Sequence, residues 1–588
     1  MVSRMSADLR LGWCVIVLAV GWMGVQLTMA QNAKGVAVEK LFPKRTVMYA
    51  TYDGGDRHQE GWKKTAAYEA LHGSGMMSFI EKLFKEGAKH AESADDDFKL
   101  IQQGAELIIS RGYTSGICLM DVGLPVPIPQ AVVVVHEGGV LVPHIGTLLS
   151  KLPDLEEIAE EKIEGRSVQV LPIPDALPGL AVSWWDEGGH LVMTVGLNGP
   201  RMLISHIKQG KGSVADHPMW ERIQQKRDGF EVTSRGWFDI GGIREAYAGV
   251  PIPGNELKEG LTVGEIIKAL GLGNAGAYTF AAGYKGRAFH SETEFDAPGE
   301  RTGLLKLLDQ KSLTLDDLPP LPAGSTNLCA KSLDLEQVYD MVIDLVKKGA
   351  EMGPPEAAEQ VEGLIGAIPD LIGFDPKGDL LSCLGGTWTV YPEPRQGGIF
   401  GMGLSIVCSV REAKQLQETV RDLLERGFES TQNDFVKLST TKKRGRDVTT
   451  LQLAGFFAPS IAVDKEWMII SLTPQTVESF LMRVDGKLEK WSPSPEQEKA
   501  LAEFPKSFTS LTISDPRVVY EAVSSAAPML FGLLQQIPIP PDDQKLGEIL
   551  NLSVADIPPA ELVGKPLFPN VSMTVLDEKG CHTLSRQS

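Results

Sequence analysis

Apolar positions along the chain follow two patterns, short continuous runs and longer segments with helical spacing. Residues 131–135 and 404–410 are mainly apolar, which is typical of buried strands. Each is followed by a segment with apolar residues three and four positions apart, residues 142–155 and 412–426, which predicts an amphipathic helix. The pattern therefore predicts a strand followed by a helix at two places along the chain.

The order of the expected elements recurs on both sides of these segments. A strand at residues 45–52 precedes a helix at 62–71, and a strand at 327–331 precedes a helix at 335–348. The later pairs are hairpins at 180–195 and 460–473, helix starts at Pro200 and Pro474, short helices at 218–226 and 495–504, strands at 230–240 and 508–513, and final helix starts at 243–250 and 516–523. This recurrence predicts an internal repeat much longer than a solenoid unit.

Turn residues also coincide in the two halves. A Gly-Arg pair opens a strand at Gly165-Arg166 and again at Gly445-Arg446, and the last element of each half reads as a hairpin around Lys285-Gly286 or Lys579-Gly580. Glycine supplies the positive φ that a tight hairpin turn requires. The spacing between matching positions drifts along the chain, which we interpret as insertions in loops.

The expected fold is α+β with two tandem homologous copies, each a mainly antiparallel sheet with helices packed on it. Short connections between neighbouring strands predict antiparallel pairing, and helices between hairpins predict the α+β class. We place a short N-terminal linker at residues 31–41, the first copy at 42–300, a Pro/Gly-rich junction at 301–325 and the second copy at 326–588.

The first thirty residues have the pattern of a secretory signal peptide. Arg4 and Arg10 precede an apolar stretch, Leu11–Leu27, and small side chains lie three residues and one residue before Gln31. This pattern predicts cleavage between Ala30 and Gln31. An uncleaved membrane anchor stays open as the alternative, because the apolar stretch is at the lower limit of a bilayer-spanning length. The expected location is the periplasm or the cell surface.

Charge argues against a nucleic-acid partner. The 588-residue chain has 76 acidic and 57 basic side chains, a formal charge of −19, so a polyanion would be repelled overall. The dense basic run Lys442–Arg446 is interpreted as a solvated hairpin loop. Outside the signal, no apolar run is long enough to span a membrane, which favours a soluble globular body after cleavage.

The cysteines do not form a disulfide framework. Five remain after the predicted cleavage, an odd number without a Cys-x-x-Cys spacing. Cys118 and Cys408 lie in apolar strand-like segments, where a thiol usually behaves as a small buried hydrophobe. The other three are Cys329, Cys383 and Cys581.

Two local motifs match catalytic or nucleotide-binding patterns without the context that those functions need. Gly271–Gly276 fits G-x-G-x-x-G but follows a helix and precedes a strand, so it predicts a helix C-cap and turn. Ser205–Lys208 fits S-x-x-K, but it lies within a helix and the chain has no K-T-G partner motif. No catalytic residue and no cofactor are therefore expected from local motifs.

A metal site is likewise not expected. His136, Glu137 and His144 form the densest His/carboxylate cluster, which we interpret as a polar turn because two glycines follow it. The acidic run Asp95–Asp97 has neither the glycine nor the glutamate of a calcium loop. Trp184-Trp185 and Trp237 could line a ligand groove, although strand tryptophans are more often core.

Several structural motifs together point to a known group of proteins. They are the export signal, the opening strand Thr-Val-Met-Tyr-Ala-Thr at 46–51, Trp62–Tyr68 on the first helix, and the closing Gly-x-x-x-x-Ser hairpin. The chain resembles a family of exported bacterial proteins of unknown function that is common in planctomycete-type bacteria. The resemblance covers most of residues 42–588. It implies an envelope setting and carries no activity, cofactor or catalytic residue.

Two functions follow as hypotheses. The first is a non-enzymatic envelope protein that binds a polymer, a lipid or a protein partner, because no catalytic set is recognisable in either half. The second is a periplasmic hydrolase whose acid and base residues are dispersed in the sequence and meet only in the fold. Residues far apart in the sequence leave no local signature, so the sequence leaves both hypotheses open.

Overall fold

The computed structural model describes most of the chain. The described residues are 36–89, 95–121, 126–149, 157–173, 178–210, 212–253, 257, 260–393, 403–431, 437–452, 458–534 and 557–588. The predicted signal peptide and its cleavage site, Ala30 and Gln31, lie outside these residues.

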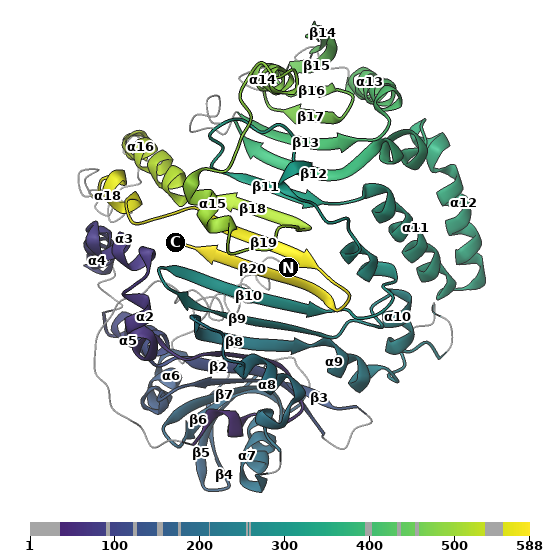
Figure 1. The fold of residues 1–588 in the computed structure, drawn as a ribbon. Helices are drawn as coiled ribbons and strands as arrows, with labels where there is room; N and C mark the ends of the chain where they lie inside the picture. Colours follow the sequence, from purple (N-terminus) through teal and green to yellow (C-terminus); the bar gives the residue numbers. More distant parts are fainter. Residues whose placement is uncertain are drawn as a thin grey trace. The chain divides into compact units, whose positions relative to one another are not determined.

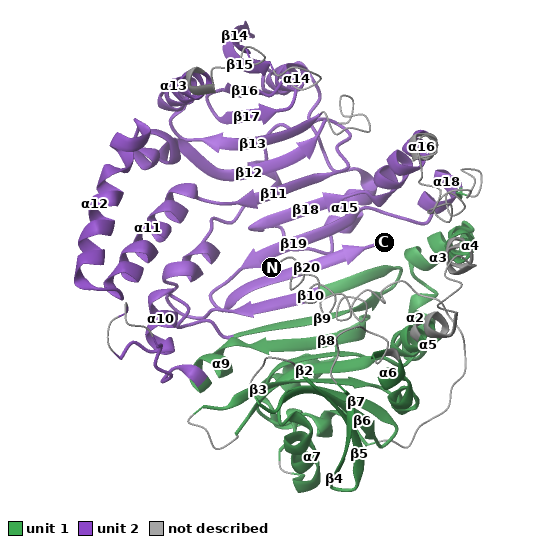
Figure 2. Ribbon diagram, turned by 180° about the vertical axis from the view of Figure 1, so that it is seen from behind, with its two compact units in different colours: residues 1–246, 277–291, 533–558 green, residues 247–276, 292–532, 559–588 purple. Residues whose placement is uncertain are grey.

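Internal contacts divide the chain into two compact units, which Figure 2 draws in different colours. Unit 1 consists of residues 1–246, 277–291 and 533–558, and unit 2 consists of the remaining segments, 247–276, 292–532 and 559–588. The division does not follow a single cut, because residues 247–276 belong to unit 2 while the residues on either side of them in the sequence belong to unit 1.

Unit 1 contains an antiparallel sheet in which each strand pairs with its neighbours in the order β9-β8-β1-β2-β3-β7-β6-β5-β4. In chain order the strands are β1 (Thr46–Tyr52), β2 (Tyr113–Met120), β3 (Ile128–Val135), β4 (Ala159–Ile163), β5 (Arg166–Pro172), β6 (Leu180–Glu187), β7 (His190–Leu197), β8 (Glu231–Asp239) and β9 (Ala277–Lys285). The strand β10 (Ala288–Asp296) pairs with β9.

Unit 2 contains an antiparallel sheet with the order β20-β19-β18-β11-β12-β13-β17-β16-β15-β14. Its strands are β11 (Leu328–Ser332), β12 (Leu384–Pro392), β13 (Leu404–Val410), β14 (Lys437–Lys443), β15 (Arg446–Gln452), β16 (Ser460–Val463), β17 (Trp467–Ser471), β18 (Ser510–Ser514), β19 (Asn570–Leu576) and β20 (Gly580–Gln587). The predicted α+β class and the antiparallel pairing are confirmed.

Helices cover both faces of the unit 1 sheet. Trp185 and Val192 share one buried cluster with Leu203 of α7, whereas Trp184 and Leu191 share another with Ile145 of α6. The adjacent tryptophans therefore point to opposite faces, and both are core residues rather than walls of a groove. The helices are α2 (Gln59–Trp62), α3 (Ala66–Gly73), α4 (Met76–Lys89), α5 (Asp95–Arg111), α6 (Val142–Leu149), α7 (Gly199–Gln209), α8 (Pro218–Gln224) and α9 (Ile240–Tyr247).

The unit 2 sheet is covered in the same manner. Val407 and Ile469 pack with Phe480 of α14, while Cys408 and Met468 pack with α13 on the other face. The helices are α10 (Val263–Ala269), α11 (Leu335–Glu351), α12 (Pro355–Ile372), α13 (Ala413–Thr431), α14 (Pro474–Val484), α15 (Pro495–Leu501), α16 (Pro516–Leu534) and α18 (Ala560–Gly564). The long helices α11 and α12 lie side by side (Figure 1). None of the described helices is long and apolar enough to cross a bilayer.

The two Gly-Arg pairs open strands as predicted. Ile163 pairs with Arg166 and Lys443 pairs with Arg446, so each hairpin has a two-residue loop. Both loop residues have positive φ in each case, +48° and +82° at Glu164-Gly165 and +52° and +76° at Arg444-Gly445. This is the turn geometry that matches the twist of the flanking strands, and glycine adopts it without steric cost.

The basic run Lys442–Arg446 forms this hairpin turn, but it is less solvated than predicted. Arg446 donates to Asp464 over 2.9 Å and to Asp485 over 2.7 Å. Carboxylates of unit 2 therefore neutralise much of the run, which does not form a free basic patch.

The proline-rich residues 301–325 pack against the unit 2 core. Leu313 and Leu321 belong to the same buried cluster as Val407, and Leu313 exchanges two backbone hydrogen bonds with Phe508. Among the cysteines, Cys118, Cys383 and Cys408 are buried, and all five that the structure describes are free thiols. Burial raises the pKa of the Cys118 and Cys408 thiols to about 12, so both stay protonated and unreactive.

Candidate ligand-binding site

The unit 1 sheet becomes polar at one end. Tyr49 of β1 pairs with Trp237 of β8, and both belong to the core. Two residues further on, the paired positions are Thr51 and Arg235, and Thr51 also pairs with Thr114 of β2. Because side chains alternate between the faces of a strand, these polar groups lie on the same face as the core residues.

A cavity of about 520 Å³ opens over these strand ends. Apart from the strand residues, the segment Val36–Glu39, Arg57 and Trp220 of α8 line it. The remaining lining residues are Asp53, His136, Glu137, His190 and Gln224. The cavity therefore combines charged, hydroxyl and aromatic groups, and all of them come from unit 1.

Asp53 is the centre of an ionic cluster beside the cavity. It follows β1 directly, and Arg235 Nη1 donates to its Oδ2 over 2.9 Å. His58 lies 3.7 Å from the same oxygen and 2.8 Å from Oε1 of Glu231. Burial opposes the charged form of Asp53, but His58 and Arg235 outweigh it, and the pKa of Asp53 is lowered.

His58 shifts in the opposite direction for the same reason. Burial alone would lower its pKa, but the carboxylates of Asp53 and Glu231 raise it above the ordinary value. The cluster is thus a chain of alternating charges in which each member stabilises the ionised form of the next.

His136, the first residue after β3, is held in one tautomer. Its Nδ1 lies 3.2 Å from the carbonyl oxygen of Arg111, which can only accept, so Nδ1 carries the proton. Its Nε2 then accepts from the Thr114 hydroxyl over 2.9 Å, and Thr114 bonds in turn to Thr51 over 2.9 Å. Burial, assisted by the nearby His190, lowers the pKa of His136 to about 4, so the ring is neutral near pH 7.

His190 is fixed in the same way by backbone groups. Its Nδ1 accepts from the Glu137 N–H over 3.1 Å, so Nε2 carries the proton and donates to the Val36 carbonyl over 3.0 Å. Glu137 itself has φ of +54°, which is uncommon for a residue with a side chain, and its carboxylate lies 3.2 Å from Arg111. These contacts tie the segment before η1 (Val38–Leu41) to the strand ends.

The structure separates the His/carboxylate cluster that the sequence singled out. His136 and Glu137 line the cavity, whereas His144 is exposed on α6. The polar-turn interpretation was therefore incomplete, since His136 is buried and hydrogen-bonded at both ring nitrogens. Within the described residues no three His, Cys, Asp or Glu side chains gather as a metal-binding group.

The two catalytic-looking motifs take structural roles. Gly271 has φ of +75° directly after α10, as expected of a helix C-cap. In the S-x-x-K match, Lys208 Nζ donates to Glu164 over 2.6 Å, which ties α7 to the β4–β5 hairpin. The acidic run Asp95–Asp97 begins α5.

Among the described residues of unit 2, the strand ends carry no comparable cluster of buried histidines. After β11, Asp334 caps α11 by accepting from the Gln337 N–H over 3.2 Å, and its carboxylate bonds to Arg411, the first residue after β13. A separate groove of about 620 Å³ runs along α13 and is lined by Asp379, Glu412, Glu418, Asp422, Lys414 and Arg426 among others.

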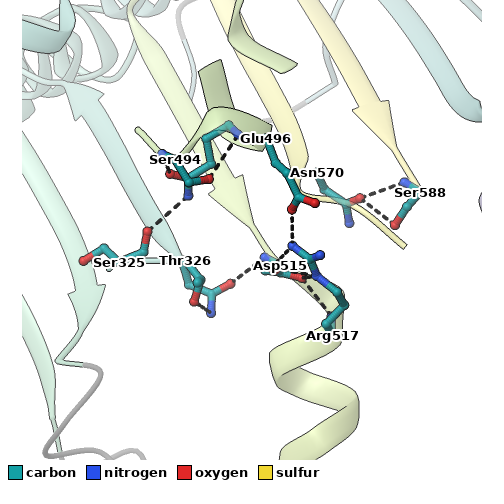
Figure 3. A network of polar contacts seen from close by, with 10 residues as sticks. Ser325, Thr326, Ser494, Glu496, Asp515, Arg517, Asn570 and Ser588 are labelled. Atoms are coloured by element: carbon teal, nitrogen blue, oxygen red, sulfur yellow. Dashed lines mark hydrogen bonds and ion pairs between the residues drawn. The ribbon is translucent and has the colours of Figure 1, made fainter. Parts of the chain in front are cut away.

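A second polar network of unit 2 lies around Arg517, at the start of α16 (Figure 3). Arg517 Nε donates to Asp515 over 2.8 Å, and its Nη2 donates to Glu496 over 2.7 Å. The Asp515 N–H donates to Asn327, which precedes β11. The Asp515 and Glu496 carboxylates raise the pKa of Arg517, and each of these charges has a partner, so the network holds α15, α16 and β11 together.

Comparisons of the chain with protein-family models, with curated proteins and with solved structures gave no match. The chemistry of the site therefore has to be judged from its own geometry.

Two properties of the Thr114–His136 contact limit its use in acid–base chemistry. Thr114 and His136 have the spacing of a nucleophile and a base, but Thr114 is fully buried within the sheet. A base whose pKa is about 4 is also poorly matched to proton transfer near neutral pH. The cavity offers fixed donors and acceptors around an open volume, as ligand-binding sites do.

Proposed function

We propose that the chain is an exported, non-enzymatic binding protein of the cell envelope and that the strand-end cavity of unit 1 holds its ligand. The observation that carries this proposal is the cavity of about 520 Å³ whose two histidines are held in fixed orientations by backbone and hydroxyl partners. Both ring nitrogens of each histidine are already bonded to protein groups, so the histidines give the cavity a fixed wall and are not free to move protons.

The location is part of the proposal. An envelope setting is supported by the signal-peptide pattern before Gln31 and by the resemblance to exported bacterial proteins. Cleavage after Ala30 would leave only five residues before Val36, which lines the cavity. An intact and a processed N-terminus would therefore differ close to the ligand site.

We further propose that the two units arose by duplication. Support comes from the strand order, which is the same from β9 to β4 as from β19 to β14. Support also comes from the two Gly-Arg hairpins. In each hairpin the arginine donates to a nearby carboxylate, Arg166 to Glu187 and Arg446 to Asp464. Each arginine also donates to the backbone carbonyl of the first loop residue, Glu164 or Arg444.

A ligand screen on the purified mature chain tests the binding function. Thermal shift and calorimetry with small envelope molecules, including sugars, amino acids, peptides and polyols, are expected to identify ligands. Gln224→Trp should abolish binding, because Gln224 is exposed at the end of α8 and lines the cavity. Gln225→Trp, at the next exposed position outside the lining, is the matched control. Binding that survives Gln224→Trp would contradict the proposed site.

The hydrolase hypothesis is tested in parallel, because the Thr114–His136 contact gives it a specific geometry. Chromogenic esters, phosphoesters and glycosides are expected to give no turnover above background. Turnover that Thr114→Val removes would establish the hydrolase instead.

A further inference from the structure

Two of the charges that line the unit 1 cavity differ from the others because they lack partners. Glu39 lies in η1 and Arg57 in η2 (Gly55–His58). Among the described residues neither side chain makes a hydrogen bond or an ion pair, and they do not pair with each other. Because Glu39 and Arg57 carry opposite charges and have no partner in the described part of the chain, both are available to a ligand in the cavity.

The electrostatic influence of both groups reaches the cavity walls. The Tyr49 hydroxyl has its pKa raised to about 12, mainly by burial and partly by the Glu39 charge. The Arg57 charge contributes, after burial and His190, to the low pKa of His136. Tyr49 and His136 both line the cavity, so the charges of Glu39 and Arg57 act on the same cavity.

The remaining charges of the site cancel. Asp53 is paired with Arg235, and Glu137 is paired with Arg111. Of the residues that line the cavity, Glu39, Asp53 and Glu137 are acidic and Arg57 and Arg235 are basic, while Arg111 balances Glu137 from outside the lining. A ligand with net charge of either sign would leave one rim charge unmatched, whereas a ligand with one charge of each sign would match both.

We propose that the unit 1 cavity binds a small zwitterion of the amino-acid or short-peptide class, with its ammonium group towards Glu39 and its carboxylate towards Arg57. This inference rests on the proposed binding function and specifies its ligand. Tyr49, Thr51 and Trp220 supply the hydroxyl and aromatic surroundings for the uncharged part of such a ligand.

A chemical double-mutant cycle tests the assignment. The probes are the dipeptide alanyl-leucine, its N-acetyl derivative, its C-terminal amide and the disaccharide maltose, each titrated calorimetrically into the mature chain. The free dipeptide is expected to bind about 10-fold more tightly than either blocked form, because each block removes one charge-assisted contact. Maltose is expected to bind more weakly still.

Two variants identify which residue binds the carboxylate of the dipeptide and which binds its ammonium group. Arg57→Gln should abolish the preference for the free carboxylate over the amide and keep the preference for the free amine. Glu39→Gln should do the reverse. Lys64→Gln and Lys40→Gln are matched controls, since both are exposed near these positions in the sequence and neither lines the cavity.

The possible outcomes separate the two proposals. Equal binding of free and blocked dipeptides, or equal effects of both variants on all probes, would overturn the zwitterion assignment. If maltose or a blocked dipeptide binds at least as tightly as the free dipeptide and Gln224→Trp abolishes that binding, the ligand class is overturned while the binding function is supported. If no molecule in the broader screen binds, the binding function itself fails.

Discussion

The ends of β1 and β11 occupy the same place in the two sheets but carry different chemistry. Tyr49 and Ala330 are the buried central residues of these strands, and an aspartate follows each of them four positions later, Asp53 and Asp334. Asp53 bonds to Arg235 in the neighbouring strand, whereas Asp334 caps a 17-residue helix, α11.

The residues after β3 and β13 complete the contrast. His136 is neutral and buried, while Arg411 is 39% exposed and bonds to Asp334 and Glu336. In unit 1 the strand ends border a cavity, and in unit 2 the corresponding charges close on one another around a helix start. Two sheets with the same strand order therefore differ at their strand ends through a few residues just beyond the strands.

The largest expected difference between the two strand ends is in acid stability. The lowered pKa of His136 means that the unfolded chain takes up this proton first, so stability falls as pH drops from about 6.5 to about 4. The loss from this group is roughly 3 kcal/mol.

Urea unfolding at pH 7 and pH 4.5 measures this effect. The stability of the natural chain relative to His136→Gln should decrease with falling pH, since glutamine keeps both hydrogen-bonding functions without titrating. His58 has the opposite sign, because its raised pKa gives stability that is present below about 6.5 and lost at higher pH. If the free energy of unfolding of the natural chain and of His136→Gln changes equally between pH 7 and pH 4.5, the role of His136 is contradicted.

Removal of the arginine partner should affect unit 1 more than unit 2. Arg235→Met leaves Asp53 partly buried with only His58 near it, and we expect a loss of about 2 kcal/mol in the free energy of unfolding. Arg411→Met breaks a more exposed pair and should cost less than about 1 kcal/mol. If denaturant titrations give the same loss in the free energy of unfolding for Arg235→Met and Arg411→Met, the two strand ends do not differ in this respect.

The helix cap of unit 2 should be separable from its ion pair. Asp334→Ala is expected to cost about 1 kcal/mol, mostly from the lost cap of α11. Asp334→Ser keeps a capping oxygen without the charge and should recover most of that loss in thermal unfolding. If Asp334→Ser is no more stable than Asp334→Ala, Asp334 stabilises unit 2 through its contact with Arg411 and not through the helix cap.

The hairpin turns should respond alike, because there the two units agree. Gly165→Ala and Gly445→Ala each place a Cβ on a residue with positive φ and open space around it. Each is expected to cost about 1 kcal/mol through backbone strain alone. Circular dichroism melts that differ clearly between the two variants would weaken the parallel between the units.

Much of the local structure could be predicted from the sequence. The strands beginning at Arg166 and Arg446, the amphipathic helices after β3 and β13, and the burial of Cys118 and Cys408 all follow from patterns within about ten residues. The single helix expected at 62–71 is divided in the structure, because Thr65 caps a new helix, α3, at that point. The long helix α12 was not predicted; none of its residues is buried, and Pro369 lies inside it, where proline usually interrupts a helix.

The site itself depended on tertiary structure. Asp53 and Arg235 are 182 positions apart, and neither has a recognisable motif around it. They meet because β1 pairs with β8 in a register that places Thr51 opposite Arg235. The sequence by itself determined which segments form strands and turns, because those choices depend on local backbone preferences and on the alternation of side chains. Only strand pairing across the sheet decided which polar residues share the cavity, since the contacts that define it join positions for which no local rule sets the distance.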